Sequence, residues 1–197
     1  MSDTSKVIYD FDPNNMPPDL LQAIGLMAMC AAQTESVVQN FIGGVLGIDS
    51  LETLALTAHM AAPLKDQAAR ALIELNGLSP GTVDVVDELL DAIKEAAGKR
   101  NVVVHNSLAM NPETGEVFSY RQSARGSLQV SLQPVSVEEI KKDAAALYDA
   151  GIHLLQFMLA YDLMPLNRTR SRLPPMDRGK KARASRVEQR HRDREKK

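Results

Sequence analysis

Residues 17–47 read PPDLLQAIGLMAMCAAQTESVVQNFIGGVLG and form the longest apolar pattern of the chain. Its apolar residues recur at steps of three and four, the spacing that places them on one face of an α-helix. Two prolines followed by Asp19 are typical of a helix start, and glycines gather at the far end, where helices commonly stop. The stretch therefore predicts one amphipathic helix of about 28 residues.

A second helical pattern covers residues 51–75. Asp49 with Glu52 predicts a capping box at its start, because each side chain can accept from the other residue's backbone amide. Pro63 lies inside the pattern, and proline removes a helical hydrogen bond and clashes with the preceding turn. We expect Pro63 either to kink this segment or to split it into two helices.

The third helical pattern begins at Ser79-Pro80, a cap followed by a proline in the first turn. Its apolar stripe runs to Ala97 and, if continued, passes through position 100. Arg100 is therefore expected on the packed or interfacial side of this helix, which is an unusual place for an arginine.

After His105 the pattern changes. Residues 111–115 are a turn cluster, and loose alternation in 117–123 and 127–133 predicts a β-hairpin around Arg125-Gly126. Ser136 and the glutamate three residues later form a second capping-box pattern, which begins a last helix that stops before Pro165.

These patterns predict an all-α fold, a four- to five-helix up-down bundle with a small β-hairpin insert before the last helix. Residues 1–18 are expected to be extended, residues 19–165 to form the helical domain, with the hairpin at about 117–133, and residues 166–197 to form a disordered basic tail.

The composition excludes several classes of protein. The single cysteine, Cys30, cannot form an internal disulfide and is expected to be a buried core residue. No cluster of cysteines and histidines has metal-ligand spacing, and no glycine-rich phosphate loop is present, so we expect no metal and no cofactor. No signal peptide pattern and no apolar run of membrane-spanning length stands out, which predicts a cytoplasmic protein without membrane contact.

Charge divides the chain unevenly. Residues 167–197 hold 13 lysines and arginines against 4 acidic residues, although the whole chain has a net charge of −2. Such a tail can contact nucleic acid through its phosphates, serve only as a solubilising segment, or fold back on the acidic body. For the first reading, the expected RNA-contacting residues are Arg168, Arg170, Arg172, Lys180, Lys181, Arg183 and Arg186.

The candidate functional segment is RNVVVH, from Arg100 to His105. An arginine offers a planar charged fork to phosphate oxygens, and a histidine transfers protons near neutral pH. On an ideal helix the two residues lie about 140° apart and are not expected to hold one phosphate. Either the helix frays at the three valines, which are β-branched, or two copies of the chain face each other across a two-fold interface.

Glu35 lies on the apolar stripe of the first helix. A carboxylate there either pairs with a cation from another helix or reaches solvent at the edge of the stripe. The other histidines outside the tail, His59 and His153, are expected to be structural or surface residues.

The order of elements, with a helix ending in Arg-Asn-x-x-x-His at Arg100, Asn101 and His105, resembles that of the HEPN-domain family over about residues 19–162. Glu35 resembles an acidic position in the first helix of related bacterial sequences. The resemblance implies a homodimeric, metal-independent endoribonuclease with RNA as its substrate. It also implies a role as a toxin or in anti-phage defence, with an antitoxin or regulatory protein as a possible partner.

In that chemistry the RNA 2′-hydroxyl attacks the adjacent phosphate, His105 acts as general base or acid, and Arg100 stabilises negative charge on the phosphate oxygens. Asn101 is expected to orient His105 or the phosphate. The alternative is a non-catalytic helical module that binds RNA or a protein. There Arg100 is structural, paired with Glu35, and His105 caps the end of its helix.

Overall fold

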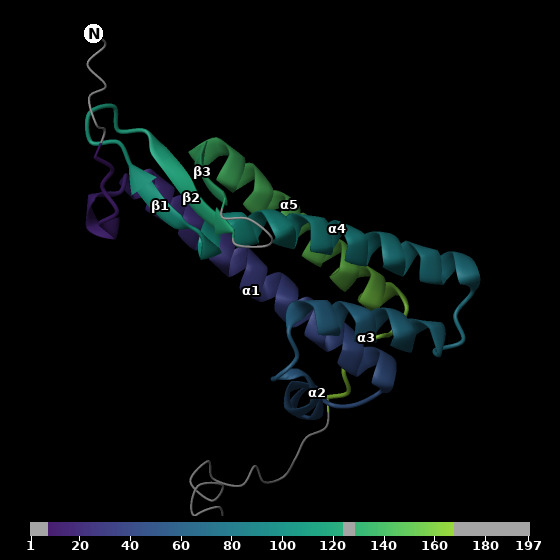
Figure 1. Ribbon diagram of the computed structural model, residues 1–197. Helices are drawn as coiled ribbons and strands as arrows, with labels where there is room; N and C mark the ends of the chain where they lie inside the picture. Colours follow the sequence, from purple (N-terminus) through teal and green to yellow (C-terminus); the bar gives the residue numbers. More distant parts are fainter. Residues whose placement is uncertain (1–7, 124–128, 168–197) are drawn as a thin grey trace, which may run out of the picture. The chain divides into compact units, whose positions relative to one another are not determined.

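The computed structural model describes residues 8–123 and 129–167. The described part contains five α-helices and a three-stranded antiparallel sheet that precedes the last helix (Figure 1). The helices are α1 (Pro18–Leu46), α2 (Ser50–Thr57), α3 (Ala62–Glu74), α4 (Pro80–His105) and α5 (Val137–Ala160). The strands are β1 (Ser107–Met110), β2 (Val117–Ser123) and β3 (Gln129–Pro134). The chain divides after Leu166 into two units, and the fold described here is that of the first.

The helix boundaries follow the local sequence. α1 begins at Pro18 and is followed by Gly47, whose φ of 62° lies in the left-handed region that glycine adopts without strain. The capping box at Asp49 and Glu52 is present at the start of α2. Pro63 occupies the first turn of α3, so the segment predicted to kink or split is in fact split into two helices.

The core consists of two clusters that follow one another along α1. The C-terminal half of α1 packs with α3, the first part of α4 and the end of α5, around Phe41, Leu90 and Leu154. The N-terminal half packs with the start of α5, the last part of α4 and the sheet, around Met27 and Leu147. The buried thiol of Cys30 belongs to this second cluster, as predicted.

α3 and α4 are also joined by an ion-pair cluster. Arg70 contacts Asp66 of its own helix at 3.1 Å and Asp87 and Asp91 of α4, each at 2.8 Å. Burial disfavours the charged guanidinium, but the attraction of Asp66 and Asp91 and the hydrogen bonds to Asp66 and Asp87 outweigh it and raise the pKa of Arg70. The cluster holds the two helices together on one side of the cavity described below.

The predicted hairpin is present as β2 and β3, whose register pairs Tyr120 with Leu132. The expected turn at Arg125-Gly126 lies outside the described residues. The sequence did not predict β1, which pairs with β2 and turns the hairpin into a three-stranded sheet. β1 has only four residues and directly follows α4, which leaves too short a stretch for its alternation to be recognised.

The described part of the N-terminal segment is attached to the sheet. Asp10 and Met110 exchange two backbone hydrogen bonds of 2.8 Å, and the rings of Tyr9 and Phe11 meet Phe118 and Tyr120 edge to face. A single short 3-10 helix, Pro13–Asn15, interrupts the predicted extended conformation. Asp10 accepts hydrogen bonds from the Asp12 amide and from the Asn15 side chain, which lower its pKa.

Among the described helices, α1 alone is long and apolar enough to cross a membrane by length and composition, with a mean hydropathy of 1.2 over its most apolar window. The expectation that no segment has this character was therefore too strict. The apolar residues on one side of α1 are used in both core clusters.

Candidate functional site

The predicted segment forms the last six residues of α4, which remains helical through His105. Of the two alternatives that the sequence left open, fraying at the three valines does not occur. Val103 packs against the second core cluster, and this burial offsets the low helix propensity of a β-branched residue. The helix ends at Asn106, whose backbone is extended.

Arg100 and His105 meet in spite of the angle between them. Nη1 of Arg100 lies 3.2 Å from Nε2 of His105 and 3.0 Å from Oδ1 of Asn101. From this angle the two residues were not expected to hold one phosphate, and their contact shows that the angle does not keep the two side chains apart. The angle of about 140° describes the directions in which side chains leave the helix axis. The arginine side chain is long enough to turn along the helix toward its last residue, and one chain thus gathers all three predicted residues.

The contact determines the roles of the atoms. A guanidinium group only donates hydrogen bonds, so in this contact Nε2 of His105 is the acceptor. The lone pair that a general base uses is therefore the one directed at Arg100. A phosphate that binds the guanidinium at this point brings its neighbouring hydroxyl groups close to the same nitrogen.

Arg100 also has unused donor capacity. Its Nε is buried and has no hydrogen-bond partner, and no carboxylate of the described residues forms an ion pair with its guanidinium. Buried charged donors without partners are uncommon, because they lose hydration without compensation. The neighbouring Lys99 differs, since it pairs with Asp143 of α5 at 3.2 Å. Arg100 is thus available to an anion in a way that Lys99 is not.

Glu35 pairs with a lysine that the sequence did not single out. Nζ of Lys65, from α3, lies 2.7 Å from Oε1 of Glu35. The Lys65 side chain is 6% exposed and that of Glu35 is 54% exposed, so both expectations for Glu35 hold in part: it meets a cation from another helix and it reaches solvent. The pairing of Arg100 with Glu35, on which the structural alternative relied, is not formed.

A sequence signal for Lys65 existed. Lys65, Ala69 and Ile73 are spaced by four and are the buried residues of α3, so the lysine lies on the buried face of its helix. A lysine in line with two core residues needs a nearby carboxylate, and Glu35 provides it.

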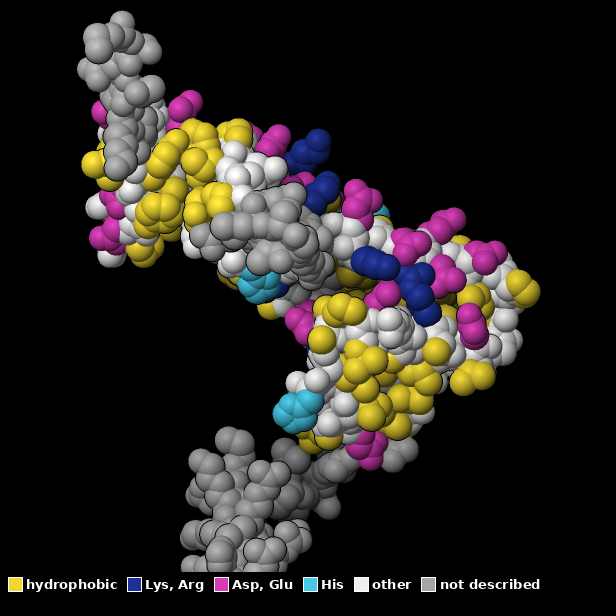
Figure 2. All heavy atoms as spheres, viewed as in Figure 1, with side chains coloured by type: hydrophobic (Ala, Val, Ile, Leu, Met, Phe, Trp, Pro, Cys, Tyr) yellow, Lys and Arg dark blue, Asp and Glu magenta, His cyan; other side chains and the backbone are white. Residues whose placement is uncertain are grey.

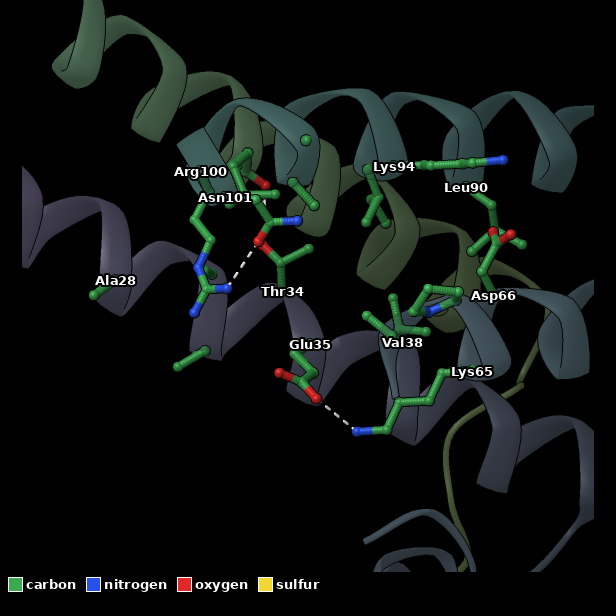
Figure 3. Close-up of a pocket in the computed structure, with 18 of the residues that line it drawn as sticks. Ala28, Thr34, Glu35, Val38, Lys65, Asp66, Leu90, Lys94, Arg100 and Asn101 are labelled. Atoms are coloured by element: carbon green, nitrogen blue, oxygen red, sulfur yellow. Dashed lines mark hydrogen bonds and ion pairs between the residues drawn. The ribbon is translucent and has the colours of Figure 1, made fainter. Parts of the chain in front are cut away.

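These residues line a cavity of about 370 Å³ between α1, α3 and α4 (Figure 3). Arg100 and Asn101 enter it from α4, Glu35 from α1 and Lys65 from α3. The remaining lining is largely apolar and includes many small side chains, namely Ala28, Ala31, Ala32, Ala62, Ala97 and Gly98. His105 is not part of the lining, and Arg100 connects it to the cavity.

Charge changes along α4. Its first part carries Asp84, Asp87, Glu88, Asp91 and Glu95, and its last part carries Lys99 and Arg100. Figure 2 shows acidic side chains along the outer side of this helix, while apolar side chains gather over α2 and α3. The cationic end of α4 is therefore the end that borders the candidate site.

The remaining predicted residues lie elsewhere. His59 follows α2 and His153 lies on α5, and both are exposed, as expected for surface residues. In residues 8–123 and 129–167, no group of three or more histidine, cysteine or acidic side chains is placed to hold a metal ion. The seven predicted tail residues, from Arg168 to Arg186, lie outside the described part of the chain.

No protein-family model, no curated protein and no solved structure matches this chain.

Proposed function

We propose that this chain is a metal-independent endoribonuclease of the HEPN type, with Arg100 and His105 as its catalytic residues. The observation that carries the proposal is the 3.2 Å contact between Nη1 of Arg100 and Nε2 of His105 at the end of α4. The contact joins a phosphate-binding group to a proton acceptor, which is the pair that cleavage by the RNA 2′-hydroxyl needs.

The reaction is a transesterification. Nε2 of His105 takes the proton of the 2′-hydroxyl, the 2′-oxygen bonds to phosphorus, and the bond from phosphorus to the 5′-oxygen breaks as that oxygen receives a proton. Arg100 holds the non-bridging oxygens, whose negative charge grows in the transition state. Asn101 accepts a hydrogen bond from Nη1 and holds the guanidinium at the end of α4, and the hydrogen bond from Nη1 to Nε2 of His105 breaks as the phosphate binds, which frees the lone pair of Nε2. The products end in a 2′,3′-cyclic phosphate and a 5′-hydroxyl.

A dimer supplies the second proton-transfer group. In an in-line displacement the attacking and leaving oxygens lie on opposite sides of phosphorus, so one imidazole is poorly placed to serve both. Two copies related by a two-fold axis bring two Arg100–His105 pairs to one cleft, where one histidine acts as the base and the other as the acid. α1, α4 and α5 run alongside one another, which supports the up-down bundle expected for this family (Figure 1).

The cellular setting follows from the same proposal. A cytoplasmic toxin or anti-phage effector needs control by a partner protein, such as an antitoxin. The tail, with 13 lysines and arginines, raises the local concentration of RNA around the body.

The test is cleavage of mixed cellular RNA by purified wild-type protein in EDTA, with analysis of the product ends. We expect fragments with 2′,3′-cyclic phosphate ends at undiminished rate in the chelator. Fragments with 3′-hydroxyl ends, or activity that EDTA removes, would contradict the mechanism.

One observation favours the second candidate, a non-catalytic module that binds RNA or protein. The hydrogen bonds of the Arg100 side chain within the described residues are to Asn101 and His105 of its own helix, an arrangement that also stabilises a helix end. This candidate predicts RNA binding without cleavage in the same experiment.

A further inference from the structure

The cavity beside Arg100 has the dimensions and lining of a ligand site. Its volume of about 370 Å³ lies at the small end of the range for small-molecule pockets, roughly 300–1,000 Å³. Apolar side chains such as Val38, Leu90 and Ile93 form much of its wall, and a few polar groups are placed at separate points. This combination suits a flat ring system with a polar edge.

The polar groups of the cavity are complementary to the hydrogen-bonding edge of one nucleic-acid base. Oε1 of Glu35 accepts from Nζ of Lys65 at 2.7 Å, and among the described residues no hydrogen bond reaches Oε2. A carboxylate with two oxygens accepts from two adjacent donors, and a lysine beside it donates to a neighbouring acceptor. Guanine alone among the four RNA bases has two adjacent donors, N1–H and N2–H, next to an acceptor, O6.

The cavity also has a cationic group that can bind the phosphate of the ligand. Arg100 lines the cavity, and its buried Nε has no partner. Lys94 also lines the cavity, but in Figure 3 its ammonium is directed away from Arg100, so Arg100 is the cation that we assign to the phosphate. In Figure 3 the guanidinium of Arg100, the carboxylate of Glu35 and the ammonium of Lys65 reach from three helices toward the same space.

We propose that this cavity binds a guanine base whose phosphate lies on Arg100. Glu35 accepts from N1–H and N2–H, Lys65 donates to O6, and the apolar walls cover the faces of the ring. The assignment of this base to an RNA residue next to the cleaved phosphate rests on the proposed function. The cavity itself would equally hold a free guanine nucleotide, which presents the same base and phosphate.

Binding of mononucleotides tests the site without any cleavage. GMP, AMP, CMP, UMP and inorganic phosphate are titrated against the full chain by calorimetry. GMP is expected to bind at least about tenfold more tightly than AMP, the discrimination of one good bidentate contact. Equal affinities for the four nucleotides would overturn the proposal.

Two leucine substitutions distinguish binding in the cavity from binding elsewhere on the surface. Ala32 is exposed on α1 and lines the cavity. Ala32→Leu is therefore expected to lower the affinity for GMP at least tenfold and to leave the affinity for inorganic phosphate unchanged. Ala92→Leu, at an exposed position of α4 outside the cavity, is the matched control and is expected to change neither affinity. Unchanged GMP binding in Ala32→Leu would overturn the proposal.

Glu35→Gln tests the reading of the base edge. Glutamine has one acceptor oxygen instead of two, so the preference for GMP over AMP is expected to fall below about threefold. Because this change also removes the negative charge beside the buried ammonium of Lys65, the folded fraction of the variant is checked by circular dichroism. If the variant unfolds, the Ala32→Leu result remains decisive. A folded Glu35→Gln variant with full preference would overturn the role of Glu35.

The source of the base is distinguished with short RNAs that carry a single guanine at varied positions. Cleavage next to guanine supports an RNA residue as the occupant. Cleavage without base preference rules out an RNA residue as the occupant and leaves the ribonuclease proposal standing; together with equal affinities for the four mononucleotides it overturns the guanine site. GMP binding without any cleavage supports the cavity as a nucleotide site and overturns the ribonuclease proposal.

Discussion

Arg100 is explained by its contacts at the scale of single residues. The sequence pattern predicts that it lies on the packed side of α4. It leaves two roles open for Arg100, an ion pair with Glu35 or the binding of a phosphate. Lys65 forms the ion pair with Glu35 instead, and Nε of Arg100 is buried without a hydrogen-bond partner. The two changes Arg100→Ala and Glu35→Ala are therefore expected to differ in their effect on stability.

Arg100→Ala is expected to lower the free energy of unfolding by less than about 1 kcal/mol, because it breaks no ion pair. Glu35→Ala leaves the buried ammonium of Lys65 without its carboxylate. Breaking a fully buried pair costs about 3–5 kcal/mol, and since Glu35 is half exposed we expect roughly 1–3 kcal/mol here. Urea unfolding of both variants measures the difference.

The double variant Glu35→Ala with Lys65→Met is the control. Removing the charge that Glu35→Ala strands is expected to restore part of the stability. A larger destabilisation in Arg100→Ala than in Glu35→Ala would show that Arg100 is the structural partner after all.

At the scale of elements, α1 organises the fold through close contact with α5. Thr34 of α1 donates from Oγ1 to the carbonyl of Leu147 at 2.9 Å, and Gly151 of α5 lies against the same threonine. A Cβ at Gly151 would lie 2.7 Å from this hydroxyl oxygen, closer than real contacts allow. The glycine thus permits the approach of the two helices.

Gly151→Ala is expected to destabilise the chain by about 1–3 kcal/mol in spite of the better helix propensity of alanine, because the added methyl group displaces Thr34. Gly25→Ala is the matched control, since a Cβ there meets nothing within 4 Å. Alanine is expected to stabilise α1 at that position by about 0.5–1 kcal/mol. Thermal melts of the two variants should therefore shift in opposite directions, and equal shifts would contradict this packing.

The elements that the sequence predicted are those with strong local signals. In α1 the apolar residues recur at steps of three and four over many turns, and α2 has a capping box at Asp49. β1 and the intact end of α4 could not be predicted, because β1 is only four residues long and the end of α4 depends on core residues far away in the chain. Val103 stays helical through burial against the second core cluster, and β1 forms because β2 and Asp10 pair with it.

The site shows the same limit. Arg100, Asn101 and His105 could be named from their spacing. Their contact could not be predicted from the angle between the residues on a helix, because the angle does not include the length of the arginine side chain. Lys65 could have been found from its spacing of four with Ala69 and Ile73, but the cavity required the packing of α3 on α1 and α4, which no local pattern reports.

At the scale of the whole molecule, the charge of the chain is divided between an acidic body and a basic tail. Removing residues 167–197 is expected to weaken RNA binding and to lower the slope of log K against log salt by about 0.7 for each RNA phosphate that the tail neutralises. Cleavage of a saturating short RNA is expected to continue. Binding isotherms at several salt concentrations measure the slope.

A chain of equal length with glutamines in place of the tail lysines and arginines is the control for the tail's bulk. It is expected to behave as the truncated chain does. An unchanged slope in both variants would show that the tail does not contact RNA.

We expect His105, held by Arg100, to cleave RNA without a metal. The decisive measurement compares the cleavage rates of wild-type protein, His105→Ala and His153→Ala in EDTA, at matched melting temperatures. His153 is an exposed histidine of α5 outside the cavity lining, and its variant is expected to cleave as the wild type does. His105→Ala is expected to reduce the rate at least about 100-fold, the lower end for a general acid or base. Equal rates in all three proteins would show that His105 is not a catalytic residue.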